Sequence, residues 1–139
     1  MRRVLFLCTG NSCRSQMAEV LWRDLGDGTW EAHSAGTKPA GHVHPFALEA
    51  LAGLQLPIDG LVSKDLTSFD GQSFDLVVTM CDSAHENCPT FPGVVDQQHW
   101  SFYDPAETEG SDDERRAVFR RVRDEISARI CVYLSRSPA

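Results

Sequence analysis

The stretch that decides the fold is Val4-Leu5-Phe6-Leu7-Cys8-Thr9-Gly10-Asn11-Ser12-Cys13-Arg14-Ser15, near the amino terminus. Its opening run of apolar residues predicts a short buried strand over residues 3–7. A polar turn containing a glycine follows, and apolar side chains then recur over residues 15–25 at the spacing of an amphipathic helix. A strand, a tight polar loop and a helix in direct succession are typical of the first unit of a parallel α/β sheet.

The rest of the chain continues this alternation. Further strands are expected over 30–34, 74–80 and 94–100, and further helices from Pro45 to Leu54 and from Ser111, as its N-cap, to Leu134. The sequence therefore predicts an α/β fold, with one domain over residues 1–139 and a four-stranded, mainly parallel sheet carrying helices on both faces. Ligands of such sheets bind at the carboxyl ends of the strands. Cys8 and Cys81 each follow a predicted strand, so both should lie at that edge.

The composition disfavours several classes of protein. The chain has 139 residues and a net charge of −7, whereas a nucleic-acid-binding protein normally presents a basic face. It has no apolar run near the roughly 18 residues of a membrane span and no signal-peptide pattern, so we expect a cytoplasmic protein, small enough to act as a monomer. In a reducing compartment its cysteines favour catalytic or redox roles over structural disulfides. There are five: Cys8, Cys13, Cys81, Cys88 and Cys131.

The polar loop has the pattern of a site for a tetrahedral oxyanion. Its backbone N–H groups and the positive end of the following helix attract negative charge, Gly10 permits unusual backbone angles, and Asn11 tolerates left-handed geometry. Arg14 offers a planar fork of donors that matches two anion oxygens. The same positive field favours the thiolate of Cys8, which makes it a nucleophile. The expected anion-binding residues are Thr9, Gly10, Asn11, Ser12, Cys13, Arg14 and Ser15. The plainer alternative is a buried strand-end cysteine before an ordinary helix turn.

A carboxylate further along the chain completes the expected catalytic set. Asp104-Pro105 follows the last predicted strand, where a loop carboxyl group can protonate a departing oxygen as a general acid. On its own, Asp-Pro is a common turn dipeptide. The catalytic interpretation of Asp104 is supported only by its expected place at the edge of the sheet where ligands bind.

The spacing of Cys81 and Cys88 limits the conformations in which the two thiols can form a disulfide. If residues 81–88 were helical, seven residues would rise about 10.5 Å, whereas a disulfide needs Cα atoms roughly 4.4–6.8 Å apart. A disulfide between the two therefore requires this polar segment to unwind, and we hypothesise a redox switch. Two alternatives stay open: the thiols are ordinary loop residues, or Cys81, His85 and Cys88 ligate zinc in a metal-binding or sensing module. Cys131 falls in the apolar pattern of the last helix and is expected to be buried and inert.

Taken together, these residues resemble the thioredoxin-coupled arsenate reductases that share the fold of the low-molecular-weight protein tyrosine phosphatases. The resemblance covers nearly the whole chain. It rests on the segment Val4–Glu19, on Ser34-Ala35-Gly36, on Asp75–Cys81 with Cys88-Pro89, on His99-Trp100, on Asp104-Pro105-Ala106 and on Val122–Ile126. The cysteine pair discriminates between the two groups, because the phosphatases of this fold do not need it.

The resemblance implies a relay of three thiols. Cys8 attacks arsenate held by the loop and Arg14, while Asp104 helps a hydroxyl group to leave. Cys81 then attacks Cys8, arsenite departs, and Cys88 attacks Cys81 to leave a Cys81–Cys88 disulfide for thioredoxin. The alternative from another class is hydrolysis of phosphate monoesters as a tyrosine phosphatase, which would use Cys8 and Arg14 in the same way.

The resemblance also bears on a metal ion. No cofactor is required, but some members bind potassium beside the loop. The matching positions here are Asn11, Glu19, Ser34 and Asp65, with Ser63 where those members use threonine.

Overall fold

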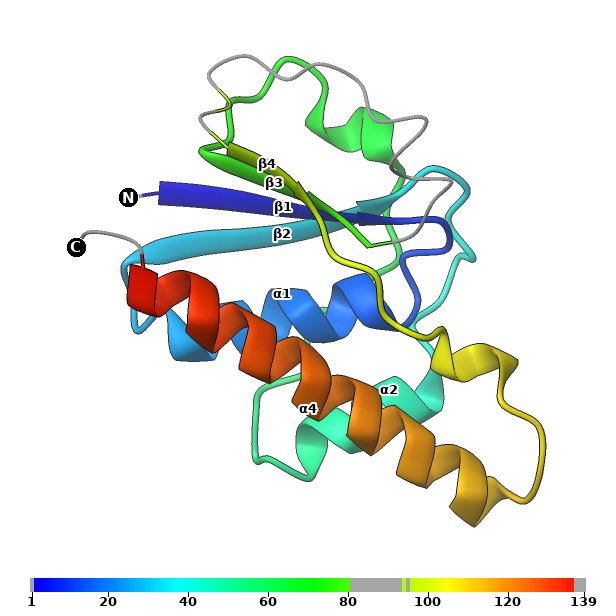
Figure 1. Ribbon diagram of the computed structural model, residues 1–139. Coiled ribbons are helices and arrows are strands. Elements are labelled where there is room, and N and C mark those ends of the chain that lie inside the picture. The colour runs from blue at the N-terminus through cyan, green and yellow to red at the C-terminus, as the bar shows by residue number, and fades with distance from the viewer. Residues whose placement is uncertain (1, 81–93, 95, 137–139) are drawn as a thin grey trace.

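The computed structural model describes residues 2–80, 94 and 96–136 (Figure 1). The strands in this part of the chain are β1 (Arg2–Cys8), β2 (Trp30–Gly36), β3 (Leu76–Thr79) and β4 (Asp96–His99). The helices are α1 (Arg14–Leu25), α2 (Pro45–Ala52) and α4 (Asp112–Arg136), with short 3₁₀ helices η1 (Leu66–Phe69) and η2 (Pro105–Glu107). Strands and helices alternate as the sequence predicts, and the predicted α/β fold is confirmed.

The four strands form one parallel sheet in the order β2-β1-β3-β4. The strand order reverses direction at β1, and a reversal of this kind opens a crevice at the carboxyl ends of the neighbouring strands. Cys8 ends β1 and pairs with Gly36 at the end of β2, while Leu7 pairs with Thr79 of β3. The register therefore brings the ends of three strands to one level.

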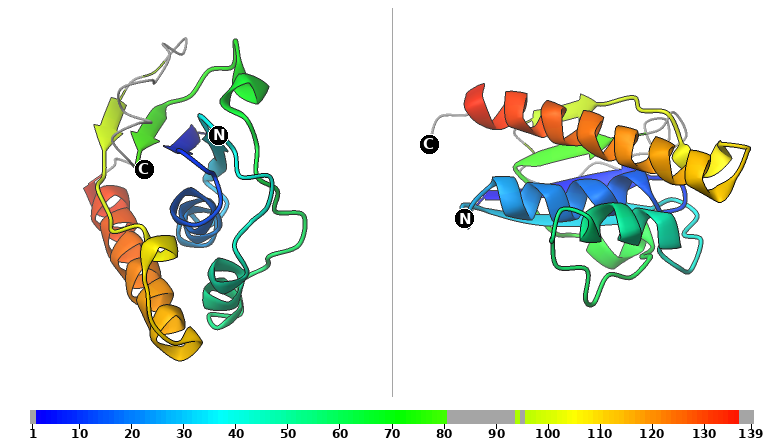
Figure 2. Two further views of the ribbon diagram at one scale, coloured as in Figure 1. Left: turned by 90° about the vertical axis from the view of Figure 1, so that its right-hand side faces the viewer. Right: turned by 90° about the horizontal axis from the view of Figure 1, so that it is seen from below.

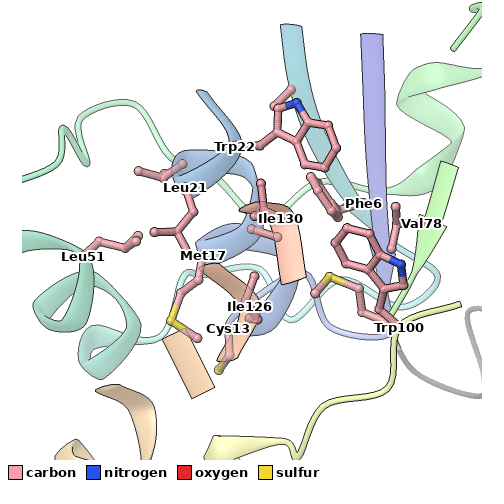
Figure 3. Close-up of a cluster of buried hydrophobic side chains, with 14 of the residues drawn as sticks. Phe6, Cys13, Met17, Leu21, Trp22, Leu51, Val78, Trp100, Ile126 and Ile130 are labelled. Carbon is pink, nitrogen blue, oxygen red and sulfur yellow. The ribbon is translucent and has the colours of Figure 1, made fainter. Parts of the chain in front are cut away.

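The three α-helices of the described residues lie together on one face of the sheet, as two further views show (Figure 2). The sequence predicts helices on both faces, and on the other face this part of the chain places only the short 3₁₀ helix η1. They bury one side of the strands in a core that includes Phe6, Trp22 and Ile126 (Figure 3). The opposite face is covered by the η1 segment, where Phe69 and Phe74 pack on Leu5 and Val77. No helix within the described residues is long and apolar enough to span a membrane.

Several boundaries and faces differ from the sequence-based expectations. The helix α2 ends at Ala52, with Gly53 as its C-cap, so Leu54, which the sequence places within this helix, lies beyond it and is 44% exposed. Cys131 is exposed, which contradicts the prediction that it is buried. The reason is helical geometry: Ile126 and Ile130, four residues apart, occupy the buried stripe, and the next residue along points away from it.

Candidate active site

A pocket opens where β1 ends and α1 begins. Its volume is about 530 Å³. The lining comes from the loop and from the segment after β4: Cys8, Thr9, Gly10, Asn11, Ser12, Cys13, Arg14, Ser101, Phe102, Asp104, Ala106 and Glu107. The fold thus brings together the cysteine, the arginine and the carboxylate that the sequence singled out, although Asp104 lies ninety residues from Arg14 in the chain.

Asn11 gives the loop its unusual shape. Its φ is 47°, in the left-handed region, and its side chain is fully buried. Its Nδ2 donates to Ser15 Oγ at 2.9 Å, and its Oδ1 accepts from Gln16 Nε2 at 2.9 Å and from the backbone N–H of Lys64 at 2.8 Å. The expectation that Asn11 tolerates left-handed geometry is confirmed, whereas the φ of Gly10 does not lie in the left-handed region. The asparagine takes this position because its side chain finds partners there.

The two thiols of the loop differ in environment. Their burial is nearly the same, since Cys8 is 5% and Cys13 6% exposed, and the difference lies in what surrounds them. Burial, reinforced by the negative charge of Asp104, raises the pKa of Cys13 to about 12, so this thiol is protonated at neutral pH. Cys13 packs against the core, close to Met17 and Ile126 (Figure 3). Its environment is that of a structural thiol, which leaves Cys8 as the nucleophile candidate.

Arg14 connects the loop to two other strand ends. Its Nη1 donates to the carbonyl of Phe102 at 2.9 Å and to the carbonyl of Met80 at 3.3 Å. Its Nη2 lies 3.7 Å from Asp104 Oδ2. The Nε–H is buried and has no hydrogen-bond partner within residues 2–80, 94 and 96–136. A buried donor is costly when unpaired, and an anion in the pocket would satisfy it.

Asp104 is held at the mouth of the pocket by its own turn. Its Oδ1 accepts from the backbone N–H of Ala106 at 3.1 Å, so the carboxylate caps η2. The side chain is 31% exposed. A partly exposed carboxyl group on the wall of the anion pocket is in a suitable place to deliver a proton to a departing oxygen.

The second half of the proposed relay lies outside the described residues. This applies to Cys81, Cys88, the zinc alternative with His85 and the hypothesised switch segment. The chain leading to them is described as far as Met80, which is fully buried and immediately follows β3. Its carbonyl is the one that Arg14 contacts, so Met80 itself lies beside the pocket.

Three of the four residues considered for potassium gather behind the loop. Ser34 Oγ donates to Glu19 Oε1 at 3.0 Å, and Asn11 reaches the same region through Lys64. Asp65 behaves differently, because its Oδ1 accepts from the N–H and hydroxyl of Thr67 at 2.8 Å each and caps η1. These bonds also hold the pKa of Asp65 below its usual range. Among the described residues no three histidine, cysteine, aspartate or glutamate side chains gather as a metal site.

Sequence reasoning missed two side chains behind the loop. Gln16 donates through Nε2 to the carbonyls of Asn11 and Val62, at 3.1 and 2.7 Å. The Lys64 ammonium lies 3.6 Å from Glu19 Oε1. The sequence carried a signal for Gln16, the third residue of α1, because a polar residue among apolar helix positions needs a hydrogen-bond partner when it is buried. No pattern in the sequence around Lys64 predicts that its side chain lies beside Glu19.

Comparison with known proteins places this geometry in context. Residues 3–136 match the family model described as low molecular weight phosphotyrosine protein phosphatase. The arsenate reductase of Halalkalibacterium halodurans is 47% identical over 131 residues, which cover 94% of this chain and 93% of the relative. The arsenate reductase of Bacillus subtilis is 44% identical over 128 residues, which cover 91% of each.

Solved structures give the same picture. An arsenate reductase in the reduced state aligns with a TM-score of 0.80 at 29% identity, covering 99% of this chain and 100% of the other. A thioredoxin-dependent arsenate reductase of Corynebacterium glutamicum aligns with a TM-score of 0.74 at 29% identity, covering 97% of this chain and 61% of the other. A low molecular weight protein tyrosine phosphatase of T. tengcongensis aligns with a TM-score of 0.77 at 26% identity, covering 99% and 100%.

Proposed function

This chain belongs to the low molecular weight phosphotyrosine protein phosphatase family, and from that premise we propose that its pocket reduces arsenate to arsenite with electrons from thioredoxin. The observation that carries the proposal is the match to arsenate reductases over more than nine-tenths of the chain. The pocket itself supplies the chemistry that such a reaction needs: a cysteine, an arginine and backbone donors around a space for a tetrahedral anion.

The first step uses the described half of the site. The Cys8 thiolate attacks the arsenic atom of arsenate, an S–As bond forms, and one As–O bond breaks. The departing oxygen takes a proton from Asp104 and leaves as water. Arg14 and the loop N–H groups hold the remaining oxygens, and Ser15 Oγ, which accepts from Asn11, keeps its own proton available for the sulfur of Cys8.

The second step transfers electrons to arsenic. The Cys81 thiolate attacks the sulfur of Cys8, and the electron pair of the S–As bond stays on arsenic, so that As(V) becomes As(III) and leaves as arsenite. Cys88 then attacks Cys81 and releases Cys8 as a thiolate. The resulting Cys81–Cys88 disulfide passes to thioredoxin by thiol–disulfide exchange. Two thiols are oxidised for each arsenate reduced, and the thioredoxin dithiol restores them.

The alternative function is hydrolysis of phosphate monoesters. It is favoured by the family description and by the likeness to a tyrosine phosphatase. Cys8, Arg14 and Asp104 would serve as nucleophile, anion clamp and general acid in both reactions. Phosphorus is not reduced in that reaction, so the alternative predicts turnover without any reductant and no role for Cys88.

An assay of NADPH consumption with thioredoxin, thioredoxin reductase and arsenate tests the proposal. The wild-type protein should turn over continuously, and Cys88→Ser should release about one arsenite per protein and then stop. Cys131→Ser is the matched control, because that cysteine is exposed on α4, and it should behave as wild type. Continuous turnover by Cys88→Ser, or rapid hydrolysis of p-nitrophenyl phosphate without arsenate reduction, would contradict the proposal.

We further propose that the protein acts as a monomer in the cytoplasm. A relay that depends on thiols needs a compartment in which they are kept reduced. Gel filtration of the reduced protein tests the first point, and fractionation of cells tests the second.

A further inference from the structure

Glu19 is an acidic side chain buried behind the anion loop. It lies on α1, and its side chain is only 3% exposed. Its Oε2 lies 3.2 Å from Arg23 Nη1. Its Oε1 accepts from Ser34 Oγ at 3.0 Å and lies 3.6 Å from the ammonium of Lys64. A buried carboxylate is costly unless it is paired, so these cations are part of what allows Glu19 to occupy this place.

Lys64 contacts the anion loop as well as the carboxylate. Its backbone N–H donates to Asn11 Oδ1 at 2.8 Å, and its ammonium also donates to the carbonyl of Val62 at 2.9 Å. Gln16 Nε2 donates to the same Val62 carbonyl and to Asn11. One short segment thus fixes the residue that gives the loop its left-handed turn and places a positive charge beside Glu19.

The oxygens in this region do not suit a potassium ion as they are arranged. Asn11 Oδ1 already accepts two hydrogen bonds, from Gln16 and from the Lys64 N–H. Glu19 Oε1 faces a hydroxyl donor and an ammonium. The Asp65 carboxylate is turned to Thr67 and is exposed to solvent. A potassium ion drawing on these oxygens would meet the positive charge of Lys64 at close range.

We propose that the ammonium of Lys64 takes the place of a bound monovalent cation behind the loop, so that this protein holds its anion site without potassium. Lys64 is then a positioning residue: it acts on the substrate through Glu19 and Asn11 and does not touch the anion. The structural part of this proposal stands on its own, and it rests on the proposed function only where arsenate turnover is used as a readout.

Replacing the charge provides the test. Wild type, Lys64→Met and Lys38→Met are compared in potassium chloride and in choline chloride at equal ionic strength, by thermal unfolding and by the KM for arsenate. Lys38 is the matched control, because it is the chain's other lysine and is exposed. For Lys64→Met we expect potassium to lower the KM at least about fivefold relative to choline, the lower end of couplings typical between linked sites. The same variant should unfold at a higher temperature in potassium.

The outcomes separate cleanly. Wild type and Lys38→Met should give the same KM and unfolding temperature in both salts. A wild-type protein that potassium stabilises or activates would overturn the proposal without any variant being needed. A folded Lys64→Met protein that responds equally to both salts would overturn it too. If Lys64→Met does not fold, Lys64→Gln replaces it, and if no arsenate is reduced in any salt, the proposed function fails while the unfolding temperatures still decide this inference.

Discussion

Gly36 lies against the anion loop, and replacing it with alanine should disturb catalysis. It ends β2 and pairs with Cys8. A Cβ added there would lie 2.5 Å from the backbone oxygen of Thr9 and 3.1 Å from two atoms of Asn11. These neighbours are mostly backbone atoms of the loop itself, so no flexible side chain can simply rotate away.

The size of the effect follows from that distance. Real Cβ atoms are essentially never found within 3.0 Å of such an atom, so the carbonyl of Thr9 and the new methyl group must separate by at least 0.5 Å. A misplacement of about 1 Å costs roughly 10²-fold in rate. We therefore expect Gly36→Ala to lower kcat/KM about tenfold to a hundredfold, which is about 1.4–2.7 kcal/mol of transition-state stabilisation. Crowding should also lower the free energy of unfolding by about 1–3 kcal/mol.

The assay is the thioredoxin-coupled arsenate reaction, with unfolding in urea measured on the same samples. Gly53→Ala is the control, because its added Cβ would find its nearest neighbours at 3.5 Å, an ordinary contact distance, and it lies at the end of α2. Gly53→Ala should keep wild-type kcat/KM. A folded Gly36→Ala protein with kcat/KM within twofold of wild type would show that the loop tolerates the displacement, and would refute this prediction.

Three further predictions concern the loop and the last helix. Arg14→Lys should lower kcat/KM about 10²-fold, because a point charge cannot replace the fork of donors, and near-normal kinetics would remove Arg14 as the anion clamp. Cys13, whose pKa is raised to about 12, should resist iodoacetamide at pH 7 while Cys8 is modified and is protected by phosphate. Equal labelling of the two, read by peptide mass spectrometry, would contradict this. Ser111→Ala should lower the free energy of unfolding by about 1 kcal/mol and leave kcat/KM unchanged, since the Ser111 hydroxyl accepts from the Glu114 N–H at the start of α4.

The sequence was sufficient where local patterns determine the outcome. The apolar run before Cys8, the helical spacing after it and the capping residue Ser111 each correspond to an element in the structure. The parallel sheet follows from their order. The placement of Asp104 in the pocket was also predictable, because strand ends in such a sheet meet at one edge.

Contacts between distant segments were out of reach. Nothing near Glu19 in the chain announces that Lys64 will lie beside it, since the two meet only after β2 and the following loops are in place. Cys131 was mispredicted for a different reason. Adjacent positions on a helix can be buried and exposed, and α4 has more apolar residues than its buried face accommodates, so the sequence does not show which of them are buried. At the anion loop, the residue type alone allowed both Gly10 and Asn11 to adopt unusual backbone angles, and only the buried partners of the Asn11 side chain decide that it is the left-handed one.

The hydrogen bonds of Arg14 have a consequence for the order of events. Its Nη1 is shared between the carbonyl of Phe102 and the carbonyl of Met80, the residue immediately before Cys81. An oxyanion that recruits this nitrogen competes with Met80 for it. Linked binding equilibria are reciprocal. If a bound anion weakens the hydrogen bond between Arg14 and Met80, that hydrogen bond weakens anion binding by the same free energy. Anion binding in the pocket and the hydrogen bond that holds Met80, the residue before Cys81, are therefore thermodynamically coupled.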